Sequence, residues 1–366
     1  MRYMIRPLTS LRLVFALMVF ASHCNIVSST FDIPLLTEGY VGVSFFFVLS
    51  GFIISYSYDS RFSAAEVGKP ALAMARRKFW VARIARIYPL HWLMLFIAAA
   101  IGTYTLANGW GDWARHFVPN LLLCQGYIPD GEYYFSFNSP SWSLCCEQLF
   151  YILFPLIVPL LHRPRQLYSL FALCTVLVIG GMWFTPAEMM KNIWYVNPLA
   201  RFPDFLLGMV VYVIFKSSDS AQWRKATDTA PAASSFRMAT LKEAAAVALF
   251  IGFYLFSIHV PQVYRYSCYY WLPVALVIFT FAQQGGILSR ILSSRPLVWG
   301  GEISFGFYLI HHLLFRLFTE AERHLQFTLS PYIAILLLLA MTIIISGASY
   351  RWFEQPVGKW IKRLLV

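Results

Sequence analysis

Apolar residues dominate the 366-residue chain, at 59% against 13% charged residues. Repeated apolar runs of membrane-spanning length exclude a series of soluble domains and indicate one membrane-embedded domain over residues 1–366. The formal net charge of +12 is concentrated in alternate connections between these runs. It therefore indicates membrane orientation, with the lipid bilayer as partner, rather than nucleic-acid binding.

The six cysteines are scattered, mostly within apolar runs, and show neither metal-ligand nor disulfide spacing. We expect them to be small core residues and expect no metal site. The first apolar run follows Arg2 and Arg6 in the manner of a secretion signal, but no small-x-small cleavage site follows it. An uncleaved first helix is therefore predicted.

The apolar pattern predicts an all-α fold of about ten transmembrane helices. The sixth and ninth are short, which favours tilting or mismatch with the bilayer. Between the third and fourth, residues 113–127 are amphipathic and are expected to lie along the membrane interface or to re-enter the bundle. In chain order, the predicted spans are 8–28, 38–58, 80–106, 140–161, 167–186, 201–215, 240–258, 266–286, 303–318 and 331–351.

Lysine and arginine placement predicts the orientation. Alternate connections, beginning with the N-terminus, hold 22 of the 29 basic residues; the opposite connections hold six, and Arg12 lies inside the first span. Because cytoplasmic loops carry the basic excess, both termini are predicted to be cytoplasmic. The polar stretch 216–242 is predicted to be a flexible cytoplasmic loop rather than a second domain.

Two ionisable residues interrupt the first apolar run, Arg12 near its start and His23 near its end. Eleven helical steps separate them, about 1,100°, so both project from one face about 16 Å apart along the axis. The simpler interpretation is an arginine that snorkels to the membrane surface and an unrelated core histidine. Their shared face, and polar residues in other spans, favour a functional role.

Arg83 and Arg86 open the third span and share a helix face, because they are three residues apart. Two guanidinium groups at this place suit a phosphate or pyrophosphate. The alternative is that they merely anchor the helix at the cytoplasmic surface.

Glu147 lies about seven residues into the fourth span, at a depth similar to that of His23, so the two could face each other. The alternative for Glu147 is a structural partner for a buried arginine. In the ninth span, Tyr308 and His311 share a face, whereas His312 is expected to point elsewhere.

Several ordered motifs together resemble the acyltransferase-3 family, bacterial multispan enzymes that O-acylate envelope and surface carbohydrates. The resemblance runs almost from end to end, and the chain stops soon after Pro356, so we expect no appended esterase-like domain. The motifs are Arg12 with His23; Gly39-Tyr-Val-Gly-Val and Phe46-Phe-Val-Leu-Ser-Gly-Phe52; Arg83-x-x-Arg86 with Ile87-Tyr-Pro; Ser141-Trp-Ser-Leu and Glu147-x-x-Phe-Tyr151; Arg201-Phe-Pro with Phe205 and Gly208; Ile303-Ser304 with Tyr308-Leu-x-His311; and Phe353-Glu354-x-Pro356.

The resemblance implies transfer of an acyl group, usually acetyl, from cytoplasmic acyl-CoA to a hydroxyl of an envelope or surface carbohydrate, in the bacterial inner (cytoplasmic) membrane. The CoA phosphates would lie at Arg83, Arg86 and Arg12, and no bound cofactor is expected besides this donor. His23 would act as general base or carry the acyl group covalently, and these two routes stay open.

The remaining candidates lie around these residues. Glu147 would orient His23 or bind the acceptor sugar, and Arg201 would hold the glycan or close the bundle. Tyr308 and His311 are assigned to substrate binding. Two other functions stay open at this point: a multispan transporter of a small polar or anionic solute, and a structural subunit of an envelope-assembly complex.

Overall fold

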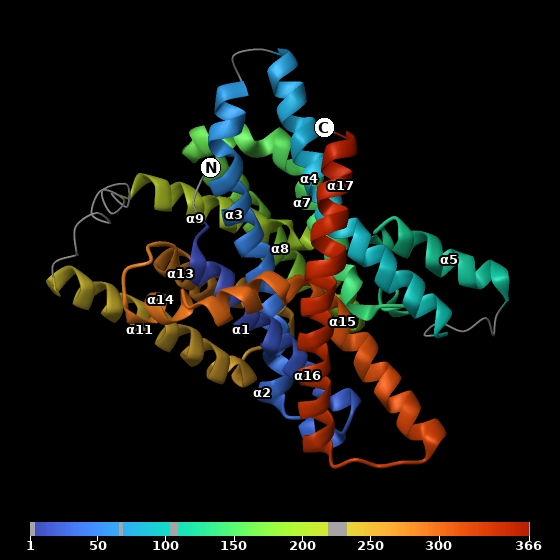
Figure 1. The fold of residues 1–366 in the computed structure, drawn as a ribbon. Coiled ribbons are helices and arrows are strands. Elements are labelled where there is room, and N and C mark those ends of the chain that lie inside the picture. Colours follow the sequence, from blue (N-terminus) through green and yellow to red (C-terminus); the bar gives the residue numbers. More distant parts are fainter. Residues whose placement is uncertain (1–3, 66–68, 103–108, 219–232, 366) are drawn as a thin grey trace.

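The computed structural model describes residues 4–65, 69–102, 109–218 and 233–365, which fold into a bundle of helices without a β-strand in these ranges (Figure 1). The helices of ten or more residues are α1 (Arg6–Ser22), α3 (Val41–Ala65), α4 (Lys69–Ala100), α5 (Trp110–Leu121), α7 (Trp142–Ile157), α8 (Pro164–Phe184), α9 (Pro198–Ser217), α11 (Ala233–Phe256), α13 (Trp271–Ala282), α15 (Arg295–Leu325), α16 (Pro331–Ser349) and α17 (Gln355–Leu365). The shorter ones are α2 (Pro34–Thr37), α6 (Gly131–Tyr134), α12 (Gln262–Arg265) and α14 (Ile287–Leu292).

Eight helical segments of the described chain are long and apolar enough to cross a membrane, which confirms a polytopic all-α membrane protein. They match eight of the predicted spans in order. The predicted span 266–286 corresponds to a shorter apolar helix, Cys268–Ala282. The span 303–318 lies in α15, where the histidine pair and Arg316 lower the mean hydropathy. The exact number of spans stays a prediction.

The chain termini lie toward the same part of the bundle, since both ends are marked in the upper half of Figure 1. The side of the membrane that they face stays a prediction. The prediction of a loop over residues 216–242 is wrong at its C-terminal end, because α11 begins at Ala233. No proline or glycine separates Ala233 from the following apolar run, so the helix extends into the polar stretch. Residues 219–232 lie outside the described chain.

Helix α1 lies between α3 and α15, and small residues allow this close packing. A Cβ added to Gly301 of α15 would lie 1.8 Å from the Thr9 carbonyl oxygen of α1. Helices α3 and α9 meet in the same way, with Gly51 against the carbonyl of Phe205. Since glycine has no Cβ, the backbones approach closely enough to fix the helix order.

Helix α4 contacts α7 through two hydrogen bonds. The Trp80 indole donates to the Tyr151 carbonyl at 3.0 Å, and the Gln148 amide donates to the Tyr88 hydroxyl at 2.9 Å.

The amphipathic stretch predicted at 113–127 begins inside α5, whose polar and apolar faces differ as expected. The cysteine prediction is only partly correct: all six are free, Cys24, Cys145 and Cys146 are buried, but Cys124 is exposed.

Candidate active site

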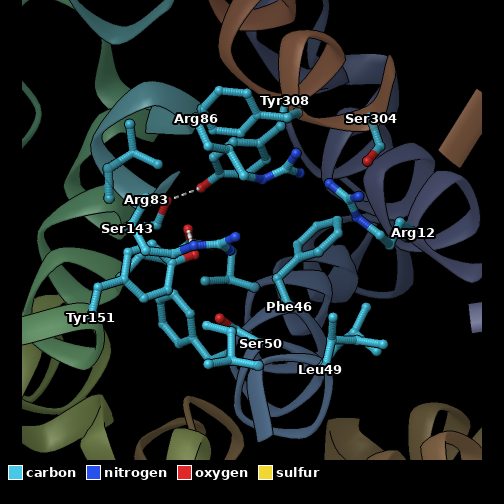
Figure 2. A pocket seen from close by; sticks show the side chains of 17 residues that line it. Arg12, Phe46, Leu49, Ser50, Arg83, Arg86, Ser143, Tyr151, Ser304 and Tyr308 are labelled. Carbon is cyan, nitrogen blue, oxygen red and sulfur yellow. Dashed lines mark hydrogen bonds between the residues drawn. The ribbon is translucent and has the colours of Figure 1, made fainter. Parts of the chain in front are cut away.

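Three arginines from two distant segments converge on one cavity of about 300 Å³, which we call the arginine cavity. Figure 2 shows the guanidinium groups of Arg12 and Arg86 directed toward one another across it. Its lining includes Arg12 of α1, Arg83 and Arg86 of α4, Glu147 and Tyr151 of α7, and Ser304 and Tyr308 of α15. All three predicted donor-binding residues thus lie together, and Glu147 lies with them.

Aromatic rings hold two of these guanidinium groups. The guanidinium carbon of Arg83 lies 5.5–5.8 Å from the ring centroids of Tyr58, Phe79 and Tyr151. That of Arg86 lies 5.6 Å from the Phe305 centroid. Such planar contacts stabilise a guanidinium and fix its orientation without neutralising its charge.

The lining of the arginine cavity has a positive excess, with three guanidinium groups against one carboxylate. Arg12 interacts electrostatically with both Arg86 and Glu147. A second carboxylate, Glu354 in the segment before α17, acts on Arg86 and Arg12 from outside the lining. Like charges that face each other in a partly buried space favour a bound anion.

Glu147 accepts a hydrogen bond from the Tyr151 hydroxyl at 2.7 Å. The prediction that it faces His23 was wrong, because Glu147 lines the arginine cavity and His23 lines a different one. Similar depth in the bundle does not determine the direction of a side chain around the helix axis. Within the described chain Glu147 forms no ion pair, and its interaction with Arg12 is electrostatic, so its role as a structural partner of an arginine stays a prediction.

His23 lines a second cavity of about 300 Å³, which we call the histidine cavity. Aromatic side chains form much of its wall, among them Tyr40, Trp142, Tyr195 and Tyr266. Lys191 is also part of the lining and is exposed. The surrounding protein lowers the pKa of the Lys191 ammonium below its usual range, because desolvation disfavours the charged form.

The hydrogen bonds of His23 define which of its ring nitrogens can act. Its Nδ1 lies 3.0 Å from the Val19 carbonyl oxygen and 3.2 Å from Nε2 of His311. His311 in turn places Nδ1 3.1 Å from the Phe307 carbonyl oxygen.

Carbonyl oxygens only accept hydrogen bonds, so in the neutral state each Nδ1 carries the proton. His311 Nε2 is then an acceptor and shares the Nδ1–H of His23. This arrangement leaves Nε2 of His23 with a lone pair, and within the described chain Nε2 has no hydrogen-bond partner. The Val19 carbonyl and His311 together fix the tautomer of His23 that leaves this lone pair on Nε2.

His312 also belongs to the histidine cavity, which corrects the prediction that it points elsewhere. Its ring centroid lies 5.3 Å from that of His23, with the rings nearly perpendicular. Its buried Nδ1 has no partner in the described chain. The adjacent histidines 311 and 312 are about 100° apart on α15, and both contact His23 because the end of α1 packs between them. The adjacent histidines in the sequence were the one signal that could have indicated a role for His312.

Tyr308 separates the two cavities and lines both. Its hydroxyl donates to Ser143 Oγ at 2.9 Å, on the arginine side, and lies 3.2 Å from the Pro140 carbonyl oxygen, on the histidine side. Figure 2 shows the Tyr308–Ser143 contact as a dashed line. Val43 also lines both cavities, so the two cavities adjoin at these two side chains.

A family model described as an acyltransferase domain matches residues 7–351 of the chain. The chain belongs to the acyltransferase-3 family. Its relatives include the acyltransferase MdmB of Streptomyces mycarofaciens, 31% identical over 97% of this chain and 92% of that protein. The peptidoglycan O-acetyltransferase OatA of Listeria monocytogenes is 26% identical over 98% of this chain.

The chain spans 56% of that OatA and 50% of the YrhL protein of Bacillus subtilis, a putative peptidoglycan O-acetyltransferase to which it is 24% identical. No solved structure matches the chain. The family membership and the spans together make this protein a multi-pass membrane O-acyltransferase, which favours an enzyme over the transporter and structural-subunit alternatives.

Arg201 of this acyltransferase lines neither of the two cavities described, which removes support for a glycan contact. It is fully buried, and its Nε lies 2.9 Å from Asp204 Oδ2. Its other nitrogens donate to Ser44 Oγ at 2.7 Å and to the Tyr266 carbonyl. These partners join α3, α9 and the segment before α13, so the alternative prediction, that Arg201 closes the bundle, agrees with the structure.

Replacing Arg201 by methionine is expected to destabilise the protein by about 3–5 kcal/mol, because it leaves the Asp204 carboxylate buried without its cation. The Arg201→Met/Asp204→Leu double variant should recover part of this loss. Heat denaturation of the purified proteins in one detergent measures both. An unchanged midpoint in the single variant would contradict the packing role.

Within the described ranges, no group of three or more His, Cys, Asp or Glu side chains could hold a metal ion.

Proposed function

We propose that the protein transfers an acetyl group from acetyl-CoA to a hydroxyl of an envelope carbohydrate, and that it does so in the bacterial cytoplasmic membrane. The observation that carries this proposal is the pair of adjoining cavities, one rich in guanidinium groups and one holding His23. The names of two relatives specify O-acetyl transfer to peptidoglycan, which supports a carbohydrate acceptor.

The arginine cavity suits the phosphates of CoA. Guanidinium groups bind phosphates in bidentate fashion, and three of them line this space with one carboxylate. The basic residues 76–78 precede Arg83 on α4, which supports a cytoplasmic entrance. The donor would bind with its phosphates here and its acyl end directed toward Tyr308.

The distance between the two cavities suits an extended donor. Arg12 and His23 are eleven residues apart along α1, about 16 Å, a length that the pantetheine arm of CoA can span. The thioester would pass Tyr308 and arrive at the histidine cavity. The acceptor hydroxyl would enter that cavity from the opposite side of the membrane.

His23 Nε2 would then act in one of two ways. As general base it takes the proton of the acceptor hydroxyl while the oxygen attacks the thioester carbonyl; the C–S bond breaks and the thiolate of CoA receives the proton. As nucleophile Nε2 attacks the thioester carbonyl, the C–S bond breaks and the CoA thiolate leaves. The acceptor hydroxyl then attacks the acyl carbon, the C–N bond to the imidazole breaks, and the hydroxyl proton passes to the CoA thiolate. His311 would hold the Nδ1–H tautomer in both routes.

The proposed function predicts that glycans from cells expressing the protein carry additional O-acetyl esters. Mass spectrometry of envelope glycans, before and after mild alkaline treatment that removes esters, measures this. Cells that express the His23→Ala variant are the matched control. Identical glycan masses in wild-type and variant cells would contradict transfer to an envelope carbohydrate.

A further inference from the structure

The histidine cavity carries a positive charge that the transfer reaction does not by itself require. Lys191 is the one Lys, Arg, Asp or Glu residue in its lining. Within the described chain no carboxylate pairs with it, and its ammonium nitrogen lies 4.9 Å from the Phe135 ring centroid. A partly desolvated cation without a counter-charge gains stability from a bound anion.

The carboxylate nearest in sequence to this lining is already compensated. Glu38 stands between the lining residues Thr37 and Tyr40, but it is buried and ion-paired with Arg265. Its other oxygen accepts from the Tyr270 hydroxyl at 2.6 Å. Glu38 therefore adds no net negative charge that could satisfy Lys191.

A second cation, Arg316, lies outside the cavity lining and acts on one lining residue, His312. Arg316 interacts electrostatically with His312 and approaches the Phe137 carbonyl oxygen at 3.5 Å. Nδ1 of His312 is also buried and has no hydrogen-bond partner in the described chain. Buried polar atoms in this state mark places that a ligand or water completes.

The aromatic wall indicates the shape of the ligand. The Trp142 and Tyr195 rings lie 4.6 Å apart, and Tyr195 continues to Tyr266 at 5.0 Å and to Tyr40 at 5.6 Å. Aromatic walls with a few polar groups are typical of small-molecule sites, and this volume is at their lower end. One sugar residue of a longer glycan matches both the size and the wall.

We propose that the histidine cavity selects an acceptor saccharide that carries a carboxylate or phosphate beside the acylated hydroxyl, with Lys191 as the counter-charge. This inference rests on the function proposed above. The anion would lie at the exposed ammonium, the ring against the aromatic wall, and the hydroxyl at His23 Nε2.

The test compares two probes of similar shape, one with a carboxylate and one with a neutral carboxamide at the same place: methyl N-acetylmuramic acid glycoside and its lactyl carboxamide. Equilibrium binding of each to the purified protein is measured by calorimetry at one ionic strength. Wild type should bind the carboxylate about tenfold more tightly, as one charge-assisted contact predicts. Lys191→Gln should abolish the preference, and Lys191→Arg should retain it. Arg115→Gln, which removes an exposed cation outside the cavity, should also retain it.

Equal affinity for the two probes in wild type, or a preference that survives in Lys191→Gln, would overturn the inference. So would failure of both probes to bind at millimolar concentration. Acetyl transfer from acetyl-CoA is recorded in parallel. Transfer to both probes without preference would leave the proposed function standing and remove the anion selectivity. Preferential binding without transfer would instead count against the proposed function.

Discussion

Replacement of His23 by alanine is expected to lower the rate of acyl transfer by about 10²–10⁴-fold, the usual contribution of a positioned general base. The physical reason is the tautomer that the structure defines. Nδ1 is engaged by Val19 and His311, so Nε2 holds the lone pair at the cavity. The measurement is single-turnover transfer from radiolabelled acetyl-CoA by protein in nanodiscs.

Donor binding provides the control for this variant. His23 lies outside the arginine cavity, so acetyl-CoA should bind His23→Ala with unchanged affinity, and a normal melting profile would show that the variant is folded. A His23→Ala rate within about tenfold of wild type would contradict the assigned role. Acid quenching of the wild-type reaction separates the two routes, because label that stays on the protein indicates an acyl-histidine.

Replacement of Arg83 or Arg86 by alanine is expected to weaken acetyl-CoA binding by about one to two decades. A hydrogen bond to a charged group contributes about 1.5–3 kcal/mol, and about 1.4 kcal/mol corresponds to a factor of ten in affinity. Lysine should restore part of the loss, because it keeps the charge but lacks the planar fork. At Arg83 the recovery should be smaller, since three aromatic rings surround that guanidinium.

Arg77 is the matched control, being an exposed arginine of α4 outside the cavity lining. Arg77→Ala should bind acetyl-CoA like wild type. If the pair only anchors α4 at the membrane surface, lysine would serve as well as arginine at both positions. Equal affinity across wild type, both alanine variants and both lysine variants would remove the support for a phosphate site.

The sequence by itself determined the helical elements, the family and the candidate residues. Apolar runs of spanning length predict membrane helices because the bilayer core admits few other backbone structures. Ionisable residues inside such runs are costly, so Arg12, His23, Arg83, Arg86 and Glu147 stand out as candidate functional residues without any structure. The spacing of Arg12 and His23 depends only on helix geometry, and the ordered motifs resemble one family over almost the whole chain.

Only the tertiary structure decided how these side chains are grouped. Depth along a helix follows from sequence, but the direction around the axis depends on which helices pack together. Where α1 packs between α3 and α15, the polar side chains of these helices lie in two separate cavities. The packing of the helices places Glu147 with the arginines and His312 with His23, and it buries Arg201 against Asp204. The position of Lys191 in the histidine cavity is also decided by the tertiary structure. Lys191 lies in the connection between α8 and α9, and no local sequence pattern specifies the path of that connection.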